Sequence, residues 1–352
     1  MTILVRQAGL CHFIVPFLMV CNAWNGAQAM GDLRLIKEVR QKGMVFALQF
    51  SPDGKTLVSS TAIGDSSPFA SSFLTVFEAA TLKQLYGPLR FRNGGGFSFS
   101  PDSKTIAAFA KDCPFIEVTT GETLFRMKGE CAPTYAGAQW LVSRGEKGLS
   151  IYDSQSRKLK RVVGPNTTRF VSRAATAQSD SVVLLDIDGN LYILELPDGD
   201  IRFLRRFPWH PVWMRYSHEK QLVFFPPKLH EHLGEIYNIK TGATLEVNCD
   251  HYGSGGEFSP GGEELAVCTF SGLLVYDTAS GKELSKLPLH KLGAGDVYDD
   301  VYSVAYSPDG KLLASGGGWY DRKVKLWAIE PLASGGHRQS GDTIRNREDT
   351  QP

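Results

Sequence analysis

At 352 residues, the chain is long enough for two average domains or for one large all-β domain. Hydrophobic residues make up 42% and charged residues 21%, which is typical of a soluble protein with a sizeable core. The formal net charge of +1 excludes an overall field that favours nucleic acid or an anionic membrane, so we expect no nucleic-acid partner. The 36 glycines and 18 prolines fall in short clusters, which indicates many tight turns between short strands.

The first 29 residues differ in kind from the rest. Arg6 precedes an apolar run over residues 8–20, and a polar stretch then ends in Ala27-Gln28-Ala29. This order predicts a secretory signal peptide over residues 1–29, cleaved after Ala29. The apolar run is shorter than the roughly 20 residues that span a bilayer. We therefore expect a periplasmic or secreted protein with no transmembrane segment after cleavage. A retained anchor and lipidation at Cys21 are the alternatives.

The rest of the chain repeats a pattern of four short strands. Its first half, two apolar strands around a tight turn, appears in FALQFSPDGKTLVSS, FSFSPDSKTIAAFA, GEFSPGGEELAVC and SVAYSPDGKLLASGG. Proline presets φ in this turn, and Asp and Gly accept its geometry, so the turn links antiparallel strands. The second half appears in VFEAATLKQL, FIEVTTGETLF, IYDSQSRKLK, LELPDGDIRF, IYNIKTGATL, VYDTASGKEL and LWAIEPL.

One aligned position marks each of the seven repeats. It is occupied by Phe77, Ile116, Tyr152, Leu194, Tyr237, Tyr276 and Trp327. The spacing is roughly 40 residues, the period of a four-stranded propeller blade. Five positions later four repeats carry a glycine that suits a tight hairpin, namely Gly121, Gly199, Gly242 and Gly281. We predict an all-β fold, a seven-bladed β-propeller of four-stranded antiparallel blades.

With these residues the chain resembles the WD-repeat β-propeller family over roughly residues 33 to 332, as a divergent, bacterial-type member. The pairs Tyr152-Asp153, Tyr276-Asp277 and Phe77-Glu78 are similar to the family's Trp-Asp dipeptide at the end of the third strand. No repeat carries the Gly-His pair that the family places before its first strand, and Trp327 is followed by Ala328. The buried hydrogen-bond network that those residues build in the family is therefore not implied here.

The last repeat shows only three strands, which predicts how the ring closes. The segment Leu33–Val39 is an unassigned strand of the right length, and pairing it into the last blade would remove an exposed edge. We expect the propeller to span residues 30–332. Residues 333–352 have no apolar periodicity, which predicts a disordered tail.

Four cysteines remain beyond the signal segment, an even number for an oxidising compartment. In a propeller, the loops after the second and fourth strands of every blade emerge on one face, here called the top face. Cys113 and Cys131 both fall at that face in blade 2, and Cys249 and Cys268 fall there in blades 5 and 6. We predict disulfides Cys113–Cys131 and Cys249–Cys268, with four buried thiols as the alternative.

The top-face loops of blades 5 to 7 collect aromatic, acidic and histidine side chains, the composition of a recognition surface. The candidate binding residues are Trp209, His210, His230, His232, His251, Tyr252, His290, Asp296, Asp299, Trp319, Tyr320, Asp321 and Arg322. We expect a non-enzymatic scaffold or ligand-binding propeller that takes a peptide, another protein or a glycan, and we expect it to be a monomer without cofactor. Simple solvation of polar loops is the other interpretation.

Two further chemistries stay open on this face. His230, His232 and His251 could ligate zinc or copper, although no fourth ligand is evident. The alternative function is a propeller hydrolase or lyase with its site at the mouth of the central channel. No G-x-S-x-G, H-E-x-x-H or phosphate-binding glycine loop supports it.

Basic residues gather in two neighbouring outer strands, Arg157, Lys158, Lys160 and Arg161 in blade 3 and Arg202, Arg205 and Arg206 in blade 4. They predict a basic stripe on the rim of the propeller. Such charges commonly prevent edge-to-edge pairing of strands. Contact with anionic lipid or with an acidic partner is the functional alternative.

Overall fold

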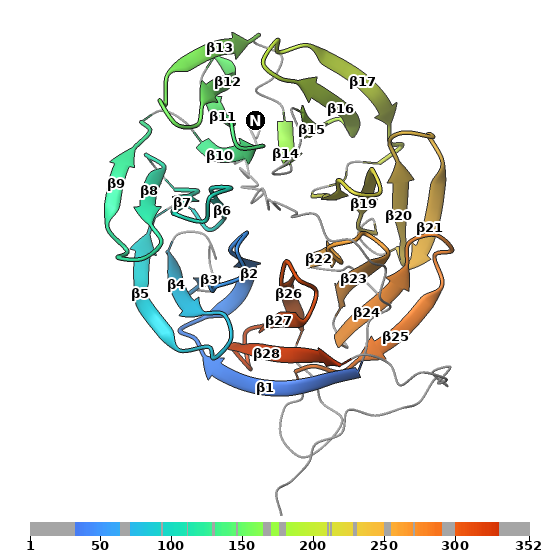
Figure 1. The fold of residues 1–352 in the computed structure, drawn as a ribbon. Helices are drawn as coiled ribbons and strands as arrows, with labels where there is room; N and C mark the ends of the chain where they lie inside the picture. The colour runs from blue at the N-terminus through green and yellow to red at the C-terminus, as the bar shows by residue number, and fades with distance from the viewer. Residues whose placement is uncertain are drawn as a thin grey trace, which may run out of the picture.

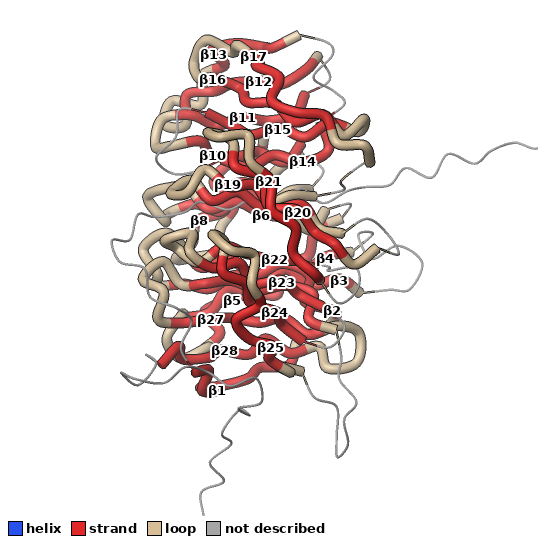
Figure 2. The backbone as a smooth tube through the Cα atoms, turned by 90° about the vertical axis from the view of Figure 1, so that its right-hand side faces the viewer, coloured by secondary structure: helices blue, strands red, loops and turns tan. Residues whose placement is uncertain are grey.

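A computed structural model of the protein describes residues 32–63, 71–92, 94–110, 112–128, 131–145, 147–164, 170–175, 181–209, 211, 213–227, 231–249, 255–269, 272–290 and 300–330. Seven four-stranded antiparallel sheets surround one axis as the blades of a propeller (Figure 1). Seen from the edge, the ring is a disk with strand ends on two opposite faces (Figure 2). The predicted all-β, seven-bladed architecture is confirmed, and the residues described contain no helix.

Each blade is built from consecutive strands, the innermost first. Blade 1 contains β2 (Met44–Phe50), β3 (Thr56–Ala62), β4 (Ser72–Glu78) and β5 (Gln84–Phe91), and blade 2 contains β6 (Phe97–Phe99), β7 (Thr105–Ala108), β8 (Pro114–Glu117) and β9 (Thr123–Arg126). Blade 3 contains β10 (Cys131–Ala136), β11 (Trp140–Gly145), β12 (Gly148–Asp153) and β13 (Leu159–Val163), and blade 4 contains β14 (Phe170–Ala175), β15 (Ser181–Asp186), β16 (Asn190–Glu195) and β17 (Ile201–Arg206). Blade 5 contains β18 (Arg215–Ser217), β19 (Leu222–Phe225), β20 (Leu233–Asn238) and β21 (Thr244–Asn248), and blade 6 contains β22 (Gly255–Phe258), β23 (Glu264–Thr269), β24 (Gly272–Asp277) and β25 (Glu283–Leu287). Blade 7 contains β26 (Val301–Tyr306), β27 (Leu312–Gly317), β28 (Lys323–Glu330) and, from the other end of the chain, β1 (Asp32–Arg40).

The seven marker residues of the repeat occupy one equivalent position, in the third strand of every blade. Each lies opposite an apolar residue of the second strand, as Phe77 does with Leu57 and Trp327 with Leu313. The tight turn between the third and fourth strands follows with φ near +75° at Gly121, Gly199, Gly242 and Gly281. In blades 1 and 3 the same position is taken by Leu82 and Arg157, with φ of 52° and 58°. The repeat therefore fixes the backbone even where the glycine is missing.

The Ser-Pro-Asp turns between the first and second strands are closed by a repeated set of hydrogen bonds. In blade 1, Oγ of Ser51 donates to Oδ1 of Asp53 at 2.6 Å and accepts from the backbone N–H of Thr56 at 3.0 Å. Ser100 and Ser307 make the same pair of bonds in blades 2 and 7. The sequence motif thus encodes its own turn.

The N-terminal strand closes the ring, as predicted. β1 pairs antiparallel with β28 from Asp32 opposite Glu330 to Arg40 opposite Lys323. Leu33 is buried in a hydrophobic cluster that also contains Trp327. The two ends of the described chain therefore hold each other in blade 7.

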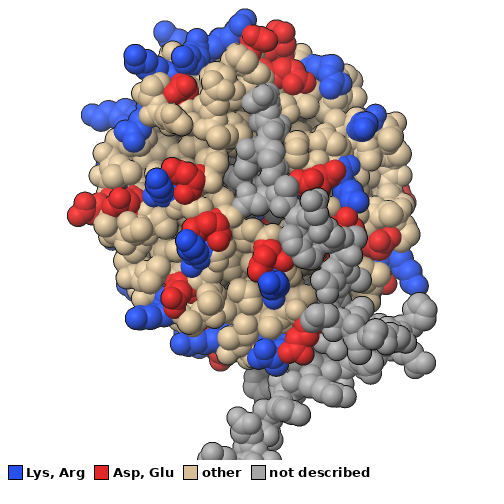
Figure 3. Space-filling model, in the orientation of Figure 1, with Lys and Arg blue, Asp and Glu red and all other residues tan. Residues whose placement is uncertain are grey.

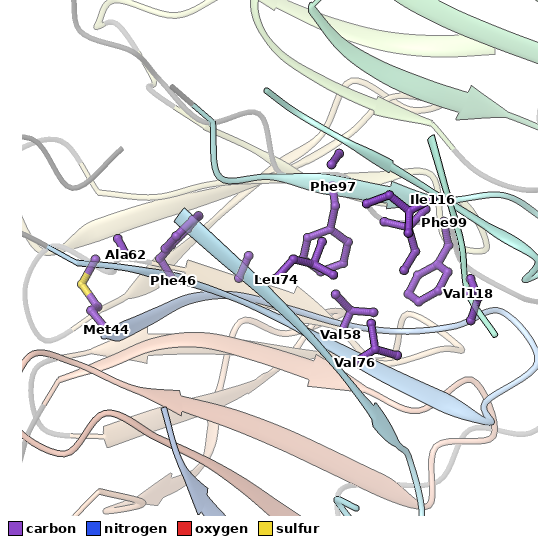
Figure 4. Close-up of a cluster of buried hydrophobic side chains, with 13 residues drawn as sticks. Met44, Phe46, Val58, Ala62, Leu74, Val76, Phe97, Phe99, Ile116 and Val118 are labelled. Atoms are coloured by element: carbon purple, nitrogen blue, oxygen red, sulfur yellow. The ribbon is translucent and has the colours of Figure 1, made fainter. Parts of the chain in front are cut away.

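Hydrophobic side chains fill the space between neighbouring blades, since each sheet presents apolar residues on both faces. Between blades 1 and 2, Val58 and Leu74 pack toward Phe97 and Ile116 (Figure 4). Equivalent clusters lie between the other neighbouring pairs of blades. This packing holds the loops of each blade in fixed positions.

The predicted Cys249–Cys268 disulfide is wrong. Both residues are buried thiols that form no disulfide. Side chains alternate across β23, so Val267 faces the cluster shared with blade 5, where Cys249 lies, while Cys268 faces the cluster shared with blade 7. The two sulfur atoms therefore lie on opposite sides of one sheet. Both cysteines lie near the top face, as expected, but they lie on opposite faces of the sheet of blade 6.

Cys113 does not form its predicted disulfide either. It is a buried thiol whose S–H donates to the carbonyl oxygen of Ala110 at 3.4 Å. The side chain of Cys131 lies outside the described residues. The cysteines consequently give no support to an oxidising compartment.

The segments 1–29 and 333–352 lie outside the described residues. The predicted signal peptide, its cleavage and the disordered tail therefore stay predictions. None of the residues described belongs to a helix long and apolar enough to cross a membrane.

Candidate functional site

The loop between β27 and β28, residues 318–322, is held in place at both ends. The backbone N–H of Arg322 donates to the carbonyl of Gly318 at 3.2 Å. The N–H of Gln41, which follows β1, donates to the carbonyl of Arg322 at 2.7 Å. Nε of Arg322 donates to the carbonyl of Trp319 at 2.5 Å, and Arg322 itself has a φ of 52°. Strand β1 and the loop's own bonds thus fix its conformation.

A buried chain of hydrogen bonds supports this loop from below. Nδ1 of His290 bonds to Oδ2 of Asp321, and Nε2 of His290 lies 2.9 Å from Oγ of Ser315. Nε1 of Trp327 donates to the same Oγ at 2.8 Å. Because an indole N–H only donates, Oγ of Ser315 accepts from Trp327, and it also lies within hydrogen-bond distance of Nε2 of His290. Nδ1 of His290 donates to the carboxylate of Asp321, since a carboxylate only accepts.

The carboxylate of Asp321 is stabilised in its ionised form. Burial by itself would raise the pKa of Asp321, but the hydrogen bond and the charge of His290, together with the charges of Lys325 and Lys323, outweigh burial and lower it. Nζ of Lys325 lies 4.0 Å from Oδ2 of Asp321, and Nζ of Lys323 lies 3.7 Å from Oδ1. Lys323 also donates to Oε1 of Glu38 in β1 at 2.5 Å. One carboxylate thus connects the loop to β28 and, through Lys323, to the closing strand.

The tip of this fixed loop carries the most exposed large aromatic side chain of the described residues. Tyr320 is 75% exposed, while Trp319 beside it is half-buried against the cluster between blades 1 and 2. Ile63, just beyond β3, is 40% exposed. A Cβ built on Gly43 would lie 3.0 Å from Cγ1 of Ile63, so Ile63 borders the segment that bonds to Arg322. The exposed surface therefore runs from blade 7 onto blade 1.

Two more candidate residues lie on top-face loops of blades 4 and 5. Trp209 follows β17 and is half-buried, with its ring 5.8 Å from that of Phe207. His232 precedes β20 with an exposed side chain, and its carbonyl accepts the N–H of Cys249 at 2.6 Å. Both loops follow a second or fourth strand, as the loop of Tyr320 does. These residues therefore share the top face, although they belong to another sector.

His290 and Asp321 do not lie on the surface where the sequence reasoning put them. Their exposed fractions are 0% and 5%, because each satisfies the other inside blade 7. They support the face and are not available to touch a ligand. The remaining candidates, His210, His230, His251, Tyr252, Asp296 and Asp299, lie outside the described residues.

Ser315, Gln41 and Ile63 belong to this site but were missed from the sequence. Ser315 carries a usable signal, because it stands two residues after Leu313, which pairs with the marker Trp327. His290 was assigned to the surface because it falls in the long insertion before blade 7. Gln41 follows β1 and Ile63 follows β3. Both are far in sequence from the 318–322 loop, so no sequence pattern connects them with it.

Metal binding by His230, His232 and His251 stays a prediction, because only His232 is described. Within the described ranges no group of three or more His, Cys, Asp or Glu side chains could hold a metal ion. The channel-mouth active site and the monomeric state likewise stay predictions. Acidic and basic side chains are intermingled over the face in Figure 3, so that face presents no single sign of charge.

These features define a closed seven-bladed β-propeller with a fixed loop face. Residues 284–328, from β25 into β28, match the family model of the WD domain, G-beta repeat. That range contains the whole buried chain from His290 to Trp327. Blade 7 therefore carries a WD repeat that is evident by sequence, and the resemblance to the WD-repeat family is confirmed. A buried hydrogen-bond network, which the sequence did not imply, is present in blade 7 and connects Asp321, His290, Ser315 and Trp327.

Solved structures share the fold of the whole ring. One is the β-propeller domain of Cps50 (Swd1) from Myceliophteria thermophila, with a TM-score of 0.65 and 12% identity, covering 85% of this chain and 100% of that chain. Another is the set of RRP9 WD40 repeats, with a TM-score of 0.68 and 10% identity, covering 86% of this chain and 100% of that chain. At such identities the likeness shows the fold alone.

Curated relatives match a short part of the chain. The human intraflagellar transport protein 122 homolog is 44% identical over 70 residues, and its Danio rerio counterpart is 41% identical over 70 residues. These stretches cover 20% of this chain and 5% of each relative. The match therefore spans a small fraction of those proteins. WD40 propellers typically act as protein-interaction scaffolds, and the bacterial type stays a prediction.

Proposed function

We propose that this propeller is an extracytoplasmic scaffold that binds a protein partner through the top-face loops of blades 5 to 7. The contact centres on the β27–β28 loop of blade 7. One observation carries the proposal: Tyr320 is 75% exposed on a loop whose backbone is fixed. A large aromatic side chain that is exposed on an ordered backbone is the kind of residue that dominates binding energy at protein interfaces.

Rigidity of the loop is the reason to favour a partner surface over simple solvation. Binding costs less entropy when the contact residues are already ordered. The hydrogen bond from Gln41 to Arg322 and the buried pair of His290 and Asp321 order the loop before a partner binds. Ile63 extends the same exposed surface with an apolar side chain. A protein partner would bury Tyr320 and Ile63 together, with Arg322 at the edge.

Affinity capture from an extract of the native cells tests the binding face. We expect Tyr320→Ala to lose a partner that the wild type retains, with little change in folding because the side chain is exposed. Lys311→Ala is the matched control, since Lys311 is exposed on a turn at the opposite face. Equal partner lists for wild type and Tyr320→Ala would remove this loop from the proposal.

The compartment rests on the pattern of residues 1–29 and is tested separately. We expect N-terminal sequencing of the protein recovered from fractionated cells to begin at Met30 in an extracytoplasmic fraction. Recovery of the unprocessed chain from the cytoplasm would contradict the extracytoplasmic location. It would not affect the proposed binding face, which the affinity capture tests independently.

A further inference from the structure

A second surface with its own chemistry lies on the rim of blades 3 and 4. Five cationic side chains, Lys158, Lys160, Arg161, Arg202 and Arg206, are exposed there. Three large apolar side chains stand among them: Leu159 is 52% exposed, Val162 39% and Phe203 55%. These eight residues, in or beside β13 and β17, form what we call the rim patch. Figure 3 shows Lys and Arg gathered at the edge of the ring, where Figure 1 draws β13.

The two strands make one continuous surface. The turn before β17 lies against β13, because a Cβ built on Gly199 would be 2.8 Å from Cγ2 of Val163 and 3.1 Å from Cδ of Arg161. Phe203 lies edge-on to the ring of Tyr192, with centroids 5.7 Å apart. Its ring is thereby held in place while more than half of it stays exposed. Basic and apolar groups of both blades thus meet the same approaching surface.

The charges of the rim patch are only partly compensated: hydrogen bonds from Ser156 and, to a smaller extent, the charge of Lys160 lower the pKa of Asp153. In the residues that the structure describes, none of the five cations forms an ion pair within 4.0 Å. Other basic residues of the outer strands are paired, as Arg34 of β1 is with Glu330 and Arg205 of β17 itself is with Glu235. Neither β13 nor β17 contains an acidic residue. Asp198 and Asp200 stand in the turn before β17, but β13 and β17 themselves contain only basic charges, so cations predominate on the rim patch.

We propose that the rim patch binds the surface of an anionic lipid bilayer. Cations interleaved with exposed Phe, Leu and Val are the combination that holds a protein at a membrane interface. The patch lies on the outer circumference of two blades, and a flat surface can meet both edges at once. An acidic peptide would pair with the cations but would leave the large apolar side chains in water. An anionic bilayer both attracts the cations and buries the apolar side chains.

Vesicle flotation of the full chain tests this proposal. One set of vesicles is phosphatidylcholine alone, and the other is equal parts of phosphatidylcholine and phosphatidylglycerol. We expect flotation only with the anionic vesicles, weakening as salt rises. The variant Lys160→Glu with Arg202→Glu should lower partitioning by roughly tenfold or more, because each basic residue near such a surface contributes about a fivefold gain. Lys282→Glu with Lys286→Glu on blade 6 is the matched control and should float as the wild type does.

A label at Phe203 tests insertion of the apolar residues. Phe203→Cys carrying an environment-sensitive fluorophore should shift its emission to the blue with anionic vesicles, while Leu284→Cys, in the outer strand of blade 6, should not. Equal flotation of the charge-reversed variant and the wild type would overturn the proposal. Binding to soluble polyglutamate without binding to vesicles would also overturn it and assign the patch to an acidic protein. Tyr320→Ala should float normally, which separates this surface from the top face.

Discussion

Ser315 provides the sharpest test of the buried network in blade 7. Its Oγ accepts from Nε1 of Trp327 at 2.8 Å and lies 2.9 Å from Nε2 of His290, in a site with an exposed fraction of 0%. Ser315→Ala leaves both of those groups buried without that partner. A buried polar group without a partner costs ~1–3 kcal/mol, so two of them lower the free energy of unfolding by about 2–6 kcal/mol.

Ser59 is a matched control at the same register of blade 1. It stands two residues after Leu57, as Ser315 stands two after Leu313, and it is equally buried. Its Oγ has no hydrogen-bond partner in the described structure. Ser59→Ala should therefore be neutral or stabilising by up to ~1 kcal/mol.

Urea unfolding of both variants, followed by tryptophan fluorescence and far-ultraviolet circular dichroism, measures the difference. We expect a lower urea midpoint for Ser315→Ala with an unchanged dependence of the unfolding free energy on urea concentration, and no loss of stability for Ser59→Ala. Equal shifts of the two midpoints would refute the reasoning, because the hydroxyl group would then matter through volume and not through its bonds.

Three other predictions concern the core and the closure. Burial raises the pKa of Glu257 well above its ordinary 4.5, against the charge of Arg215. The folded state then binds this proton more tightly, so the contribution of Glu257 to stability is fully present below about pH 4.5 and is lost as pH rises through the folded pKa. Glu257→Gln should flatten this decline in unfolding experiments across pH, and parallel profiles would contradict it. Leu33→Ala should cost about 2–4 kcal/mol by opening a cavity at the closing strand, while the exposed Ile36→Ala should cost little in the same unfolding assay. Cys249 and Cys268 should resist alkylation in the native state and react fully in denaturant without reductant, and a need for reductant would restore the disulfide.

Local sequence patterns were sufficient to predict the blades. The Ser-Pro-Asp turns close through their own side chains, and the marker residues of blades 1 to 6 recur in strands that pair only with neighbours in sequence. The closing strand followed by counting, because three strands in the last repeat left one place for Leu33–Val39. Each of these inferences needed only short-range information or a count.

Contacts between blades were harder to predict. The prediction of the Cys249–Cys268 disulfide failed because side chains alternate between the two faces of a strand. A shift of one residue in register decides whether Cys268 faces blade 5 or blade 7. His290 was misplaced because its partners, Ser315 and Asp321, lie beyond a long insertion in the sequence. Tyr320 was named as a candidate from the sequence and its role in binding stays a prediction, while the structure shows that its loop is fixed.

Site-specific photo-crosslinking in the native cells tests the proposed scaffold role most directly. A photoreactive phenylalanine analogue at position 320 should join the protein to a defined partner, while the same analogue at position 309, on the opposite face, should not. A crosslink that appears equally from both positions, or from position 309 alone, would contradict binding through the top face of blade 7.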